Sequence, residues 1–144
     1  MHEETDLLSN DLWHDPAFEH YPAVIAHEYW RLYDLLKEKQ VYGALLQIKD
    51  LFEVILKMPV LVHAACLFRK ERDSGENRLL LALLDKLSLG TWLGIGRQMY
   101  NQLELPDSAA DIDEHLKAVL GLFEKHKIVS WRNDVIGHGA LSIN

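Results

Sequence analysis

The sequence predicts an all-α protein, a mostly antiparallel bundle of five to six helices. Apolar residues recur every three or four positions in several segments, which is the spacing of one face of an α-helix. No segment shows the sustained alternation of apolar and polar residues that a half-buried strand needs. The chain has 144 residues, 49% hydrophobic and 26% charged, which is enough for one domain with a real core.

Two helices are predicted between residues 22 and 72. Pro22 suits the first turn of a helix, and the stripe after it predicts a helix that ends near residues 38–40. A second, amphipathic helix is expected from Val41 onward. Pro59 should kink or break it, because a proline inside a helix removes a backbone donor and clashes with the preceding turn. Residues 60–68 are apolar all round, so we expect them in the centre of the bundle.

Two shorter helices follow. The run 73–77, Asp-Ser-Gly-Glu-Asn, is rich in residues that favour turns. It is expected to separate the preceding helix from a short apolar helix over residues 78–87. Ser88 has the side chain of a helix N-cap, and we expect it to cap a helix over residues 89–103.

The last long helix is predicted over residues 109–127. Leu105 and Pro106 interrupt the chain before it, and Asp107 or Ser108 is expected to cap it. Ile112, Leu116, Val119 or Leu120, and Phe123 make a clean apolar stripe, which is typical of a helix with one buried face.

An acidic N-terminal segment, residues 1–19, is predicted to pack on a helical domain formed by residues 20–144. The net charge is −7, which by itself argues against a nucleic-acid partner, because phosphate groups bind basic surfaces. The first twenty residues contain six acidic side chains and no Lys or Arg, so they account for −6 of this charge. The rest of the chain is therefore nearly neutral, and local patches decide what it binds.

The sequence predicts a cytoplasmic protein. Cys66 is the single cysteine, so it cannot form an internal disulfide, and a reducing compartment is expected. The acidic N-terminus lacks the basic start and apolar core of a signal peptide. No apolar run is expected to reach the length of a bilayer-spanning helix, so no membrane contact is predicted.

The segment after the last predicted helix is locally basic on an acidic protein. Lys125, Lys127 and Arg132 outnumber Asp134 there. Because positive side chains attract phosphate groups, Lys125 and Lys127 are candidate substrate-binding residues.

Residues 131–139 are the one stretch whose pattern suggests chemistry. Arg132 is followed at once by Asn133 and, six residues on, by His138. His138 lies between Gly137 and Gly139, which free the backbone and let a large ligand approach the imidazole. Arg132, Asn133 and His138 are the candidate catalytic residues, and the two glycines are candidate substrate-binding positions.

With five residues between Arg132 and His138 and an Asn directly after the Arg, this segment resembles the HEPN superfamily of small helical bundles. Nuclease members of that superfamily share an Arg-x(4–6)-His motif. The number and length of the preceding helices are similar too, so the resemblance covers residues 20–144. The family's motif is normally followed by more helix, whereas this chain stops at Asn144. We therefore expect a domain cut from a longer protein, or one that lacks the closing helix.

The resemblance implies a metal-independent endoribonuclease that needs no cofactor. A histidine can exchange protons near neutral pH, so His138 can serve as base or acid. Arg132 stays charged and presents a planar fork to phosphate oxygens, which suits it to stabilise the transition state. Asn133 would orient one of these two side chains or hold the phosphate. DNA, which lacks the 2′-hydroxyl, should not be cut.

The resemblance also implies a homodimer. On one straight helix Arg132 and His138 would lie roughly 120° apart and about 9 Å apart along the axis, so they would not converge. Either the backbone bends near Gly137, or two copies of the motif meet across a dimer, as is usual in the family. The resemblance implies RNA as the substrate partner, and a fused or separate sensor module or an antitoxin as the regulator. The implied role is that of a toxin or effector in bacterial defence.

Two other interpretations stay open. The segment is equally typical of a helix end, with Gly137 or Gly139 as the C-cap glycine and His138 favoured by the helix dipole. The whole domain is also compatible with a non-catalytic helical adaptor that oligomerises or docks a protein partner.

Overall fold

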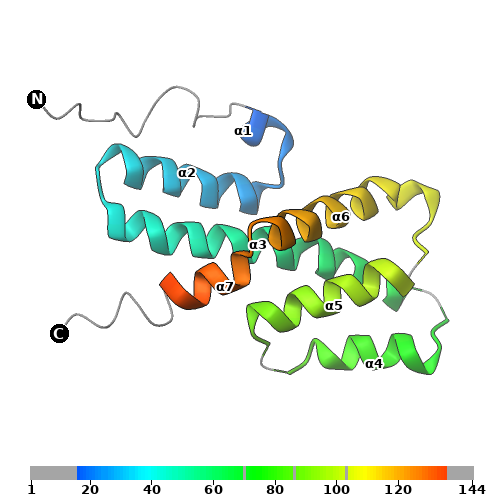
Figure 1. Cartoon of the computed structure of the whole chain (residues 1–144). Helices are drawn as coiled ribbons and strands as arrows, with labels where there is room; N and C mark the ends of the chain where they lie inside the picture. The colour runs from blue at the N-terminus through cyan, green and yellow to red at the C-terminus, as the bar shows by residue number, and fades with distance from the viewer. Residues whose placement is uncertain (1–15, 70, 86, 103, 136–144) are drawn as a thin grey trace, which may run out of the picture. The chain divides into compact units, whose positions relative to one another are not determined.

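The computed structural model describes residues 16–69, 71–85, 87–102 and 104–135 (Figure 1). Within these ranges the regular structure is helical and contains no strand, which confirms the predicted all-α fold. The helices are α1 Pro16–His20, α2 Ala23–Lys37, α3 Val41–Phe68, α4 Ser74–Ala82, α5 Leu89–Gln102, α6 Ala110–Lys125 and α7 Ile128–Arg132. The chain forms two compact units, Met1–Val54 and Ile55–Asn144, and their boundary falls inside α3.

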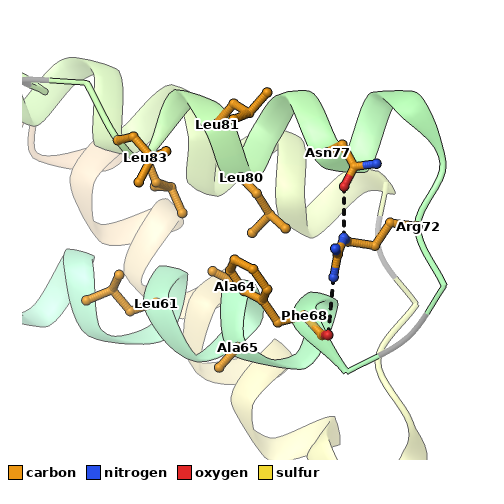
Figure 2. A pocket seen from close by; sticks show the side chains of 10 residues that line it. Leu61, Ala64, Ala65, Phe68, Arg72, Asn77, Leu80, Leu81 and Leu83 are labelled. Carbon is orange, nitrogen blue, oxygen red and sulfur yellow. Dashed lines mark hydrogen bonds between the residues drawn. The ribbon is translucent and has the colours of Figure 1, made fainter.

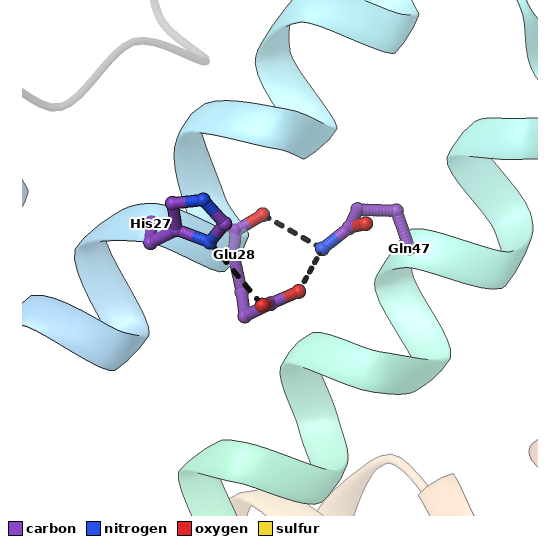
Figure 3. Close-up of polar contacts among 3 residues, drawn as sticks. All are labelled: His27, Glu28 and Gln47. Carbon is purple, nitrogen blue, oxygen red and sulfur yellow. Dashed lines mark hydrogen bonds and ion pairs between the residues drawn. The ribbon is translucent and has the colours of Figure 1, made fainter.

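In the first unit, α2 and the beginning of α3 form an antiparallel helical hairpin. Gln47 on α3 is 3% exposed, and its Nε2 donates to the backbone carbonyl of Glu28 on α2 at 3.0 Å and to the Glu28 carboxylate (Figure 3). The Nδ1 of His27 lies 3.4 Å from the other carboxylate oxygen. Because Gln47 is buried, these bonds satisfy the two N–H donors of its amide and join α2 to α3.

Residues 1–15 lie outside the described residues. Most of the predicted packing of segment 1–19 on the helical domain therefore stays a prediction. The described end of that segment is α1, which contacts α2. The α2 helix begins after Pro22, whose carbonyl accepts from the backbone N–H of Ile25 and Ala26. It ends at Lys37, one residue before the predicted range 38–40.

In the second unit, the remainder of α3 packs with α5 and α6. A Cβ at Gly96 on α5 would lie 3.2 Å from Val60 Cγ2 and 3.4 Å from Leu120 Cδ2, so the absence of a side chain permits this close approach. The side chains buried most completely in this unit are Leu56, Val60, His63, Leu67, Met99, Leu116 and Phe123. They form the core of this unit.

Pro59 does not break α3, so of the two predicted outcomes, a kink or a break, the break is wrong and the kink stays a prediction. The helix is continuous from Val41 to Phe68. Pro59 is buried, as are Leu56 and Val60 beside it, and this tertiary burial offsets the lost backbone hydrogen bond. The Nδ1 of His63 lies 2.8 Å from the Pro59 carbonyl oxygen, one helical turn away.

The α3 helix is also long and apolar enough to cross a membrane, by length and composition alone. This corrects the expectation that no apolar run has the necessary length. One such helix is weak evidence for a membrane span, because the core helix of a soluble protein passes the same test. Of the most apolar stretch of α3, 33% is buried inside the protein, and the structure is compatible with a soluble protein.

Residues 73–77 begin α4 rather than forming a separate turn. Asp73 is the N-cap: its carboxylate accepts from the backbone N–H of Glu76 at 2.8 Å, and the Glu76 side chain accepts from the backbone N–H of Asp73 at 3.1 Å. This reciprocal capping box satisfies two backbone donors at the helix start. Residues that favour turns also favour N-caps, which explains the wrong prediction.

Replacing Asp73 with alanine is expected to lower the free energy of unfolding by roughly 0.5–2 kcal/mol, because the backbone donor of Glu76 loses its partner. Urea denaturation followed by circular dichroism measures this loss. Ser74→Ala, one residue on, is the matched control and should change stability by a few tenths of a kcal/mol at most. An equal loss in both variants would contradict the capping role of Asp73.

The N-cap prediction is confirmed for α5 and wrong for α6. Ser88 caps α5 as predicted, because its Oγ accepts from the backbone N–H of Thr91 at 3.2 Å. Neither Asp107 nor Ser108 caps α6. Both lie in a 3-10 turn, Asp107–Ala109, and α6 begins at Ala110 without a side-chain cap.

Candidate functional site

The candidate motif begins on α7, a short helix that follows a sharp turn. The α6 helix ends at Lys125 rather than at the predicted residue 127. Lys127 then adopts a left-handed conformation, with φ of 49°, and the chain turns into α7. Ile128, 4% exposed, anchors α7 in the core, and Lys127 O accepts from Trp131 N at 2.9 Å. The backbone continues past Arg132 as a π-helical turn over residues 133–135.

Arg132 and Asn133 are hydrogen-bonded to each other. The Nη1 of Arg132 donates to Asn133 Oδ1 at 3.1 Å. Arg132 is half-buried and its Nε is buried, whereas Asn133 is exposed. The guanidinium is therefore oriented by the residue that follows it, and this is one of the roles predicted for Asn133.

The other half of the motif lies outside the described residues. This holds for His138 and for Gly137 and Gly139 on either side of it. The approach of Arg132 to His138 therefore stays a prediction, and so does the alternative that this segment is only a capped helix end.

Lys125 and Lys127 are both exposed, at the end of α6 and in the turn before α7. Lys127 contributes to a groove of about 300 Å³ between α5, α6 and α7. The groove is lined by Leu93, Arg97, Phe123, Glu124, Lys127, Val129 and Ser130. Val129 lies three residues before Arg132 on the same helix, so the two side chains are neighbours on one face. Arg132 itself is not among the residues that line the groove.

Arg97 is a basic residue of this groove that the sequence did not reveal. Its Nε donates to Glu124 Oε1 at 2.7 Å, across the pair of antiparallel helices α5 and α6. The two residues are 27 positions apart, and no local pattern connects them. In the described part of the chain, no group of three or more His, Cys, Asp or Glu side chains is placed to hold a metal ion.

A second and larger groove lies between the C-terminal half of α3 and α4 (Figure 2). It has a volume of about 580 Å³. Its lining is almost entirely apolar and includes Leu61, Ala64, Phe68, Leu80, Leu81 and Leu84. At one end, Arg72 Nε donates to Asn77 Oδ1 at 2.8 Å and Arg72 Nη1 donates to the Phe68 carbonyl at 3.2 Å, which closes the groove there.

The prediction that residues 60–68 are central in the bundle is therefore correct for only one face of α3. Val60 and Leu67 are buried, whereas Leu61 is 52% and Phe68 66% exposed. Leu81 on α4 is 62% exposed, and Leu84, two residues beyond the end of α4, is 82% exposed. Large apolar side chains gathered in one groove mark a binding surface more often than a solvated one.

Comparison with known proteins identifies no relative: no family model, no curated protein and no solved structure gives a significant match to this chain. The resemblance to the HEPN superfamily thus rests on the Arg132–His138 motif and on the helical bundle that precedes it.

Proposed function

We propose that the protein is a metal-independent endoribonuclease in which Arg132 and His138 act on one phosphodiester of RNA. The observation that carries the proposal is the hydrogen bond from Arg132 Nη1 to Asn133 Oδ1. It orients a partly buried guanidinium on the same short helix as Val129, which lines a groove that also holds Lys127 and the Arg97–Glu124 ion pair. A charged group oriented before substrate binds stabilises a transition state better than a freely moving one.

In this mechanism His138 removes the proton of a ribose 2′-hydroxyl. The 2′-oxygen attacks the adjacent phosphorus, and the bond from phosphorus to the 5′-oxygen of the next nucleotide breaks. The leaving oxygen takes up a proton, so the products are a 2′,3′-cyclic phosphate and a 5′-hydroxyl. Arg132 stabilises the negative charge that accumulates on the phosphorane oxygens.

The basic residues Lys125 and Lys127 would bind the phosphates that flank the scissile one, because both are exposed next to α7. The wider role carried by the family resemblance is that of a cytoplasmic toxin or effector in bacterial defence. It would act as a homodimer and be restrained by a sensor module or an antitoxin.

The test is cleavage of total RNA by the purified protein in EDTA. Wild type is expected to cut RNA but not DNA and to leave 2′,3′-cyclic phosphate ends, which terminal-phosphate analysis detects. His138→Ala should abolish cleavage and remove any toxicity on expression. His126→Ala, in the exposed turn before α7, is the matched control and should cut as wild type does. Absence of cleavage by wild type refutes the proposal.

A non-catalytic helical adaptor is the second candidate function, and the apolar groove between α3 and α4 is the observation that favours it. An adaptor binds through exposed apolar side chains, and Leu84, at 82% exposure, is the clearest of them. This candidate predicts intact RNA and equal growth of cells that express wild type or His138→Ala.

A further inference from the structure

We propose that the groove between α3 and α4 binds a small anionic amphiphile, a fatty acid of medium chain length. Its carboxylate would contact Arg72 and its acyl chain would lie along the apolar lining. Neither Arg132 nor His138 takes part, so this proposal is independent of the ribonuclease proposal. Two features support it: the charge of the lining is confined to one end, and no carboxylate of the described residues pairs with that charge.

The lining of the groove is apolar except at one end. Arg72 and Asn77 lie at that end, and Leu61 and Leu83 lie at the other (Figure 2). The volume of about 580 Å³ falls within the range of pockets that bind small molecules, which combine apolar walls with a few well-placed polar groups. This distribution matches a ligand with one charged end and an apolar chain.

The guanidinium of Arg72 is held in one orientation. Its Nε donates to Asn77 Oδ1 at 2.8 Å, and its Nη1 donates to the carbonyl oxygens of Leu67 at 3.3 Å and Phe68 at 3.2 Å. The guanidinium carbon also lies 5.1 Å from the centre of the Phe68 ring, which is within the range of a cation–π contact. A ligand that binds a side chain already held in place loses less free energy in ordering it.

The positive charge of Arg72 has no ion-pair partner among the described residues, and its Nη2 makes no hydrogen bond to them. Two acidic residues follow closely in sequence, Asp73 and Glu76. Each of their carboxylates accepts from the backbone N–H of the other residue at the start of α4. The carboxylate of a ligand can therefore accept from Arg72 Nη2, in a hydrogen bond that the opposite charges strengthen.

The closed end of the groove favours a fatty acid over a protein helix. An amphipathic helix places apolar residues along a groove over two turns and continues beyond it, whereas a fatty acid ends in the group that Arg72 binds. From Leu61 to Phe68 the groove follows α3 for about 10 Å, the length of an acyl chain of medium size. A membrane surface would require several Lys and Arg, but Arg72 is the one charged residue among the described residues of this lining.

The first test is isothermal titration calorimetry of the full chain with octanoate, decanoate and decanol, each below the concentration at which it aggregates. Decanoate should bind about tenfold more tightly than octanoate, because two more CH₂ groups are buried. Decanol, which has the same chain without the charge, should bind about tenfold more weakly than decanoate.

The second test separates a ligand contact of Arg72 from a structural role. Arg72→Gln should weaken binding of decanoate about tenfold, because a charged hydrogen bond is lost, and should leave binding of decanol unchanged. A purely structural role would lower the affinity for both ligands. Arg78→Gln is the matched control: it removes the same charge from an exposed position of α4 that does not line the groove, and both affinities should stay as in wild type.

The third test fills the groove. Ala65 lines it and is exposed, so Ala65→Leu should block both decanoate and decanol while the fold stays intact, which circular dichroism verifies. Ala118→Leu makes the same change at an exposed position of α6 and should leave binding unchanged. In ¹H–¹⁵N spectra, decanoate should shift the backbone amides of α3 and α4 that border the groove.

Three results would overturn the proposal. They are the absence of decanoate binding to wild type, an affinity that does not depend on chain length, and an equal loss of decanoate and decanol binding in Arg72→Gln. A groove that serves only to dock a protein partner would appear as the first of these results. RNA cleavage is measured separately, so binding of decanoate without cleavage supports this inference while refuting the ribonuclease proposal.

Discussion

Replacing Arg132 with alanine is expected to slow RNA cleavage by roughly two to three orders of magnitude, the usual effect of removing one group that stabilises a developing negative charge. Arg132→Lys should recover only part of this loss, because lysine keeps the charge but not the planar fork that contacts two phosphate oxygens. Lysine also cannot reproduce the bond from Nη1 to Asn133 Oδ1 in the same geometry. Single-turnover cleavage of a labelled RNA oligonucleotide measures the three rates.

The matched control is Arg31→Ala, which removes an exposed arginine from α2 in the other unit. This variant has the same net charge as Arg132→Ala, so a general loss of electrostatic attraction for RNA would affect both equally. We expect cleavage within about twofold of wild type for Arg31→Ala, as for most surface substitutions away from a site. Equal rates for both alanine variants would exclude Arg132 from catalysis.

Sequence alone predicts those helices whose apolar residues recur with helical spacing. The stripe of α6 predicts that Leu116 and Phe123 face the core, and both are buried. The absence of a break at Pro59 has a physical cause: Leu56 and Val60 near the proline are buried, and this packing stabilises the helix across it. Asp73 and Glu76 carried the spacing of a capping box, but neighbours that also favour turns concealed it.

Part of the candidate site could likewise be predicted from the sequence, and part of it could not. Arg132 and Asn133 are adjacent in sequence, so their interaction was accessible to motif analysis. The groove beside them was not, since Arg97 reaches Glu124 only after α5 and α6 have packed against each other. The apolar groove was hidden for another reason. Where every position from 60 to 68 but one is apolar, periodicity cannot distinguish Leu61 and Phe68, which are exposed, from Val60 and Leu67, which are buried.

The core under the candidate site is expected to depend strongly on Phe123. Its side chain is 1% exposed on α6 and also lines the groove between α5, α6 and α7. Phe123→Ala should therefore lower the free energy of unfolding by roughly 3–5 kcal/mol, from lost burial and from the cavity left behind. That is a large share of the 5–15 kcal/mol typical of a domain, and urea denaturation followed by circular dichroism measures it.

Leu122 provides the control, because it is the preceding residue of the same helix and is 39% exposed. Leu122→Ala keeps the helix propensity nearly constant and removes a side chain that is already in contact with water, so it should cost about 1 kcal/mol or less. The difference between the two variants isolates burial from helix formation. If both variants lost the same stability, the face of α6 that packs on α3 and α5 would have to be reassigned, and with it the position of α7 and Arg132.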